Sequence, residues 1–113
     1  MPSLTELASY LESIAPAQTA ESWDNVGVLV RCAQEVTGVL CALDITPATV
    51  REARAVGCNA IVSHHPVIFR PLKELRQGDV PALLVREGVS AVCMHTNLDK
   101  AQGGVNDVLA QAL

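Results

Sequence analysis

Three histidines and an aspartate in this sequence are of the side-chain types that ligate metal ions. His64 and His65 are adjacent, and His95 lies four residues before Asp99. The pair of histidines with Asp99 would form a mixed set of nitrogen and oxygen ligands. Such a set suits zinc, iron, manganese, nickel or cobalt better than magnesium or calcium, which prefer oxygen ligands. A divalent transition metal ion is therefore the cofactor that these residues favour.

The adjacency of His64 and His65 sets a condition on the local backbone. Neighbouring side chains in a regular strand point to opposite faces, so one shared site requires that the strand has already ended. Pro66 helps to end it, because proline interrupts a strand. If the strand continued, the two histidines would serve two different ions. The carboxylate of Asp99 has two oxygens and could bridge two metal ions.

Spacing alone leaves a second interpretation open. A histidine at the end of a strand is usually a hydrogen-bonded loop residue, and an aspartate after a strand usually forms a turn or a helix cap. Two histidines followed at a distance by an aspartate also lack the fixed ligand spacing of motifs such as HExxH. Metal binding and a purely structural role both fit the spacing.

Four short apolar segments, predicted as buried strands, would position these residues. They cover residues 27–30, 37–43, 59–63 and 89–94. The last three are followed by polar side chains, namely Asp44, the His64 and His65 pair, and His95. Because the carboxyl ends of parallel strands share one edge of a sheet, we expect these side chains to converge there.

Helices are predicted between the strands, from capping residues and from apolar residues at helical spacing. Their starts and ends are marked by the Ser3 and Glu6 capping box, the Thr46 and Pro47 pair, Gly57, Pro81, Gly88 and Val105. The alternation predicts an α/β fold, with a mostly parallel sheet of about four strands flanked by helices. We expect residues 1–113 to form a single domain, whose last helical pattern the chain end cuts short.

Composition excludes several classes of function. The net charge of −4, without a run of lysine or arginine, argues against a nucleic-acid partner. No apolar run approaches the ~18 residues that span a bilayer, and no basic segment precedes one at the start, so we expect a cytoplasmic protein without a membrane segment. The four cysteines are spaced singly and are predicted to be reduced core thiols. Cys93 could share a face with His95, but we favour a small buried apolar residue.

Five motifs, in this order, resemble the GTP cyclohydrolase 1 type 2 homologue family, which is also described as Ngg-interacting-factor-like. They are WDNVG at residues 23–27, ALDIT at 42–46, SHHP at 63–66, HTNLD at 95–99 and GGVND at 103–107. The resemblance extends from the first helix to the last residue. The histidine motif SHHP and the HTNLD motif together are specific for the family.

The resemblance implies a dinuclear metal centre in which His64, His65 and Asp99 are ligands and His95 lies close to the site. Family members are longer than this chain, and a further histidine and glutamate near their C-terminal end complete the centre. Neither has a counterpart here, so the chain resembles the N-terminal half of a longer protein. The resemblance also implies a homo-oligomer, in the form of toroidal hexamers, and ring opening of GTP, hence a nucleotide substrate.

Other motif residues are expected to support the site. Trp23 is predicted as a packing anchor. Asp24 and Asn25 either brace the metal loop through hydrogen bonds or form an Asx turn. Asp44 either supports the metal site through a hydrogen bond or supports the turn before Thr46, and we favour the turn.

We therefore expect a divalent-metal-binding protein that contributes half of a dinuclear site. One interpretation is a metal-dependent hydrolase, in which the ions lower the pKa of water and His95 or a metal hydroxide is the general base. The alternatives are a metal-binding or interaction module without chemistry, or an inactive remnant of a longer protein. Three evident ligands could hold a metal ion but would leave the site poorly formed, which favours these alternatives. A closed structural zinc site would have four protein ligands.

Overall fold

The sheet at the centre of the molecule has four short strands in the order β1-β4-β3-β2. The computed structural model describes residues 2–112, and the strands are β1 (Gly27–Val30), β2 (Val39–Ala42), β3 (Ala60–Ser63) and β4 (Ser90–Cys93). Strands β2, β3 and β4 are parallel, and β1 pairs with β4 in the antiparallel direction. The predicted α/β fold with a mostly parallel, four-stranded sheet is confirmed.

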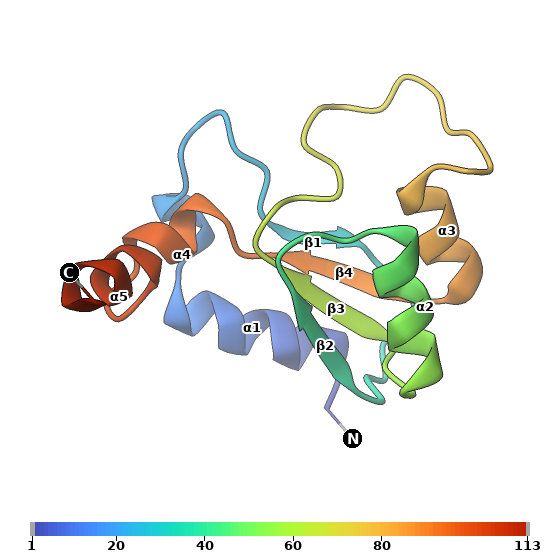
Figure 1. The fold of residues 1–113 in the computed structure, drawn as a ribbon, viewed down its shortest axis with the longest axis horizontal. Helices are drawn as coiled ribbons and strands as arrows, with labels where there is room; N and C mark the ends of the chain where they lie inside the picture. Colours follow the sequence, from blue (N-terminus) through green and yellow to red (C-terminus); the bar gives the residue numbers. More distant parts are fainter. Residues whose placement is uncertain (1, 113) are drawn as a thin grey trace.

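Helices α1 (Leu4–Ile14), α2 (Pro47–Ala55) and α3 (Val80–Glu87) cover the two faces of the sheet (Figure 1). Helices α4 (Thr96–Lys100) and α5 (Val105–Ala112) pack against each other beyond one end of the sheet, and a 3₁₀ turn covers Ala17–Thr19. Helices α2 and α3 pack on one face, where Val50, Leu84 and Ile61 are fully buried. Helix α1 packs on the other face, where Leu4 contacts the cluster of Ala60 and Val92.

The helix ends follow the predicted capping residues. The Ser3 hydroxyl accepts a hydrogen bond from the Glu6 amide at 3.0 Å, and the Thr46 hydroxyl accepts one from Thr49 at 3.2 Å. Gly88 ends α3 in the left-handed conformation, with a φ of 69°. These caps satisfy backbone groups that a helix leaves unpaired, which is why they were readable from the sequence.

Two elements differ from the prediction. The segment predicted as a buried strand over residues 37–43 forms the shorter edge strand β2, whose residues alternate between exposed and half-buried. No helix was predicted between residue 94 and Val105, but residues Thr96–Lys100 are helical. Its five residues are too few to show helical periodicity in a sequence.

Within residues 2–112, no helix is both long enough and apolar enough to cross a membrane.

Candidate metal centre

The carboxyl ends of the three parallel strands lie side by side. Ala42 pairs with Ser63, and Ser63 pairs with Cys93, so β2, β3 and β4 end at the same level of the sheet. The chain then delivers Asp44 after β2, His64 and His65 after β3, and His95 after β4. The register therefore brings together residues that are distant in sequence, as expected for this edge of a parallel sheet.

His64, His65 and His95 form a compact histidine cluster. One potential ligand atom from each of the three side chains lies within 4.8 Å of the others. The distances between ring centroids are 5.3 Å for His64 and His65, 5.0 Å for His64 and His95, and 5.6 Å for His65 and His95. Only Asp99, of the four predicted site residues, lies outside this group of three.

The two adjacent histidines can face one site because β3 ends at Ser63, before either of them. The hydroxyl of Ser63 donates a hydrogen bond to the carbonyl oxygen of His65 at 2.8 Å, which closes the turn. The backbone amide of His65 donates to the carbonyl oxygen of Leu43 at 3.0 Å. The strand therefore ends before the two histidines, as one shared site for both of them requires.

Each histidine of the cluster uses its Nδ1 atom for a contact away from the centre. The partner of His64 Nδ1 is the carbonyl oxygen of Met94 at 2.9 Å. His65 Nδ1 lies 2.7 Å from Asp44 Oδ1, and His95 Nδ1 lies 2.9 Å from Asp24 Oδ1. A carbonyl oxygen and an ionised carboxylate can only accept, so Nδ1 carries the hydrogen. In the neutral ring the lone pair is then on Nε2, which is free to bind a metal ion.

Asp99 approaches the cluster from helix α4. Its Oδ1 atom lies 3.4 Å from Nε2 of His64. The helix begins directly after His95, and the amide of Asp99 donates to the His95 carbonyl oxygen at 3.1 Å. This single turn of helix places the carboxylate on the side of His64 that carries the free ring nitrogen.

Asp24 holds His95 from the loop before β1. Its side chain is fully buried, and its Oδ2 atom accepts from the Thr96 hydroxyl at 2.7 Å and the Thr96 amide at 3.1 Å. Burial opposes the ionisation of Asp24, but hydrogen bonds from His95, Thr96 and Asn25 outweigh it and lower the pKa to about 2. Of the two roles predicted for Asp24, the bracing role is the one that this geometry supports.

Asp44 holds His65 in a more open setting. The Asp44 side chain is 56% exposed and that of His65 is 47% exposed. Of the two roles considered for Asp44, the geometry supports the one that was not favoured, a contact with a histidine of the site. The pairing of β2 with β3 creates it, because that pairing sets the end of β2 beside the residues that follow Ser63.

The prediction that Trp23 is a packing anchor is wrong, because the residue is 59% exposed. The indole lies edge-on to Phe69, with ring centroids 6.1 Å apart, and edge-on to His95, at 6.4 Å. The side-chain amide of Asn25 donates to the carbonyl oxygen of Ile68 at 2.7 Å, which ties the two loops together. An exposed aromatic pair thus stands at the rim of the histidine cluster.

Cys93 lies beneath the cluster and is buried. Its thiol donates to the carbonyl oxygen of His64 at 3.4 Å. Burial first, and then the negative charge of Asp24, raise the pKa of the Cys93 thiol to about 12. A thiol in this state packs as a small apolar residue, as predicted. All four cysteines are free, but Cys41 is exposed and does not belong to the core.

The donor set suits a transition metal ion. Three imidazole nitrogens with a nearby carboxylate are ligands that zinc, manganese, iron, nickel and cobalt accept, while calcium and magnesium favour oxygen. His64 and His95 are each 20% exposed, so a ligand can reach the cluster from solvent.

Comparison with known proteins finds a family whose model matches this chain. A family model described as Duf34/NIF3 (NGG1p interacting factor 3) matches residues 2–113. A Staphylococcus aureus protein named "GTP cyclohydrolase 1 type 2 homolog" is 44% identical over 114 residues, which cover 97% of this chain and 31% of that protein. The chain therefore spans about a third of the length of the curated relatives that it matches.

Two solved structures share the fold at high similarity. The crystal structure of a hypothetical protein from Staphylococcus aureus has a TM-score of 0.87 and 43% sequence identity, covering 97% of this chain and 38% of that chain. A Bacillus cereus protein related to NIF3 also has a TM-score of 0.87, with 37% identity, covering 98% of this chain and 32% of that one.

Proposed function

We propose that this chain, which belongs to the Duf34/NIF3 family, binds a divalent transition metal ion at its histidine cluster, as one part of a dinuclear centre. The observation that carries the proposal is the set of Nδ1 contacts. Each contact fixes a ring and leaves its Nε2 atom available. Metal-binding histidines are typically oriented in this way by carboxylates and backbone carbonyls.

His64, His65 and Asp99 are the proposed ligands. Asp99 has two carboxylate oxygens, so it can bind the same ion as His64 with one and a second ion with the other. Its distance of 3.4 Å from His64 Nε2 leaves the two groups close enough to share an ion after a small adjustment. The remaining ligands of a second ion would come from residues outside this chain, which covers only part of its relatives' length.

His95 is the proposed general base. Its Nδ1 atom is held by the ionised carboxylate of Asp24, an arrangement that fixes the tautomer and stabilises the ring after it accepts a proton. A bound divalent ion would supply a Lewis acid that polarises a substrate oxygen and lowers the pKa of water. His95 Nε2 would then take the proton from the attacking water.

The proposed reaction is metal-dependent hydrolysis of a nucleotide. The family match and the name of the Staphylococcus aureus relative, a GTP cyclohydrolase 1 type 2 homologue, support this substrate class. Assembly of several copies of the chain in the cytoplasm belongs to the same proposal. A binding module without chemistry is the second candidate, favoured by the three ligands that this chain offers for a dinuclear centre.

Metal binding can be tested by calorimetric titration of zinc or manganese into the metal-free chain. Fluorescence of Trp23, the only tryptophan in the chain, is a second readout because its ring lies beside His95. We expect the variants H64A and D99A to bind zinc at least about tenfold more weakly. The matched control is D107A, which removes an exposed carboxylate of α5. Unchanged affinity in H64A, with an intact circular dichroism spectrum, would refute the proposed site.

Turnover separates the two candidate functions. We expect the chain to hydrolyse GTP when manganese, zinc or nickel is added, and H95Q to lose turnover while it keeps most of its metal affinity. Metal binding without turnover above an H64A control would assign the chain to the binding module. Equal loss of affinity in H95Q and H64A would make His95 a ligand instead of the base.

A further inference from the structure

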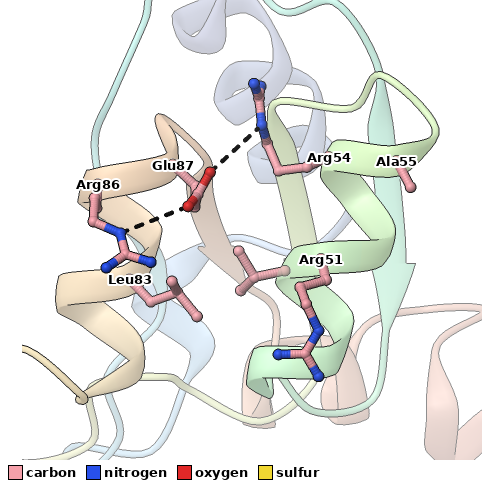
Figure 2. Close-up of a pocket in the computed structure, with 7 residues that line it drawn as sticks. Arg51, Arg54, Ala55, Leu83, Arg86 and Glu87 are labelled. Carbon is pink, nitrogen blue, oxygen red and sulfur yellow. Dashed lines mark ion pairs between the residues drawn. The ribbon is translucent and has the colours of Figure 1, made fainter.

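A groove between α2 and α3 gathers three arginines over an apolar floor. Its volume is about 480 Å³, which is within the range of small-molecule sites. Val50 in its floor is fully buried, and Leu83 is half-buried. The charged residues that line it are Arg51 and Arg54 from α2 and Arg86 and Glu87 from α3. We call these four residues and their floor the arginine groove (Figure 2).

Glu87 is the only acidic residue that lines the groove. Its Oε2 atom lies 3.9 Å from Arg54 Nε, and its Oε1 atom lies 3.6 Å from Arg86 Nε. Both distances exceed the ~2.8 Å of a tight hydrogen bond between arginine and a carboxylate. One carboxylate therefore sits loosely between guanidinium groups from two helices, as Figure 2 shows.

Arg51 adds a positive charge that no carboxylate balances. Within residues 2–112 no acidic side chain lies within ion-pair distance of its guanidinium group. In Figure 2 its side chain extends away from Glu87, along the same groove. The groove thus carries more positive than negative charge, in a chain whose net charge is −4. Such a local excess attracts anions.

We propose that the arginine groove binds a small molecule that carries a phosphate group and an apolar portion. Guanidinium groups present paired N–H donors that match phosphate oxygens, and a phosphate dianion attracts them more strongly than the single charge of Glu87. The apolar portion would lie against Leu83, the half-buried residue of the floor. No residue of the groove belongs to the histidine cluster, so this site is independent of the proposed metal centre.

A purely structural role explains the groove less well. Exposed ion pairs contribute little to stability, and the two long contacts of Glu87 would hold α2 and α3 together only weakly. That role also gives no reason for Arg51, which has no acidic partner among residues 2–112. A flat acidic protein partner fits less well than a small molecule, because the site is a hollow with an apolar floor.

The test is a calorimetric titration of phenyl phosphate into the metal-free chain at constant ionic strength. Metal-free protein removes any contribution from the histidine cluster. We expect R51A to weaken binding about tenfold or more, since a charge-assisted hydrogen bond is lost. We expect E87Q to tighten binding several-fold, because the competing carboxylate is gone. R31A is the matched control, since Arg31 is an exposed arginine outside the groove, and should bind as the wild type does.

Backbone amide shifts in nuclear magnetic resonance spectra locate the site without a variant. We expect phenyl phosphate to move signals of residues 50–55 and 83–87. Equal weakening in R51A and R31A would mean diffuse attraction by surface charge and would overturn the proposal. The proposal also fails if neither the wild type nor E87Q binds phenyl phosphate, or if an acidic peptide binds the groove and phenyl phosphate does not.

Discussion

Each ring of the histidine cluster is held by its own partner, whereas two arginines of the groove share a single carboxylate and the third has none within residues 2–112. The contacts that hold the three rings are 2.7 to 2.9 Å long. The contacts of Glu87 with the two arginines are 3.6 and 3.9 Å long, between side chains that are partly exposed. The cluster is therefore held by short hydrogen bonds, while the groove depends on flexible side chains at a helix surface.

The difference matters because a metal ion and an organic anion make different demands. A metal ion requires ligand atoms within a few tenths of an ångström of fixed positions. A phosphate group accepts hydrogen bonds from several directions, and arginine side chains can adjust to it. The fixed rings of the cluster suit a metal ion, and the flexible arginine side chains of the groove can adjust to a phosphate group.

Thiol reactivity should show the largest difference between the two regions. Cys93 is buried beneath the cluster, and its thiol has a pKa of about 12. Cys32 is half-buried beneath α3, where its thiol donates to the carbonyl oxygen of Leu84 at 3.9 Å. At pH 8 only about one Cys93 thiol in ten thousand would be ionised, and the thiolate is the reactive form. We expect iodoacetamide to modify Cys32 at least about a hundredfold faster than Cys93.

Mass spectrometry of peptides after timed alkylation measures these rates. Cys41, which is exposed, serves as the fast internal reference, and alkylation in urea shows the reactivity of the unfolded chain. Comparable rates for Cys93 and Cys32 in the folded chain would mean that the sheet opens beneath the cluster as readily as beneath α3. That result would contradict the rigidity assigned to the cluster.

Substitution of Asp24 should cost the most stability. In D24N one carboxylate oxygen becomes an amide group, which donates hydrogen bonds. Because His95 and Thr96 both present donors to Asp24, either orientation of the amide places two donors face to face. We expect the free energy of unfolding to fall by about 2 kcal/mol and metal-dependent GTP hydrolysis to fall at least about tenfold. Zinc affinity should change little, because His95 is the proposed base and not a ligand. Urea unfolding, the hydrolysis assay and calorimetry measure these effects.

The matched control for D24N is D107N. The Asp107 side chain is exposed, and it accepts one hydrogen bond, from the Gly103 amide at 2.7 Å. We expect D107N to change the free energy of unfolding by less than about 0.5 kcal/mol. If D24N were as stable as D107N and hydrolysed GTP like the wild type, Asp24 would not position His95.

Asp44 should matter less than Asp24, although it contacts a histidine in the same way. Both partners of the contact between Asp44 and His65 are about half exposed, so water can replace the carboxylate. In D44N the remaining side-chain oxygen can still accept from His65 Nδ1. We therefore expect zinc affinity to fall less than about tenfold, with stability within about 0.5 kcal/mol of the wild type. A loss of stability larger than that of D24N would reverse the order of the two carboxylates.

The ends of the helices were easier to predict from the sequence than the contacts and exposure of individual side chains. The caps at Ser3, Thr46 and Gly88 are local signals, so they were found. The convergence of Asp44, His64 and His95 was also predictable, since it follows from three strands that run parallel and end at polar residues. The exposure of Trp23 was not predictable, because an apolar ring carries no local signal of which side it faces.

The features that the sequence did not predict depend on how strands pair and how helices pack against each other. The contact of Asp44 with His65 depends on the register of β2 and β3, which a single sequence does not specify. The arginine groove depends on α2 lying beside α3, so Arg51 and Arg86 appear unrelated in the sequence. Helix α4 was missed because a single turn is defined by its contacts and not by its periodicity.

The smallest effect is expected for the ion pair between Arg54 and Glu87. Its atoms are 3.9 Å apart, and the two side chains are 53% and 36% exposed. A double-mutant cycle with R54A and E87A should give a coupling of less than about 0.5 kcal/mol in urea unfolding, and added salt should reduce it further. A coupling above about 1 kcal/mol would mean that Glu87 is fixed by Arg54. The carboxylate would then resist displacement by a phosphate, and the groove would resemble the cluster in rigidity.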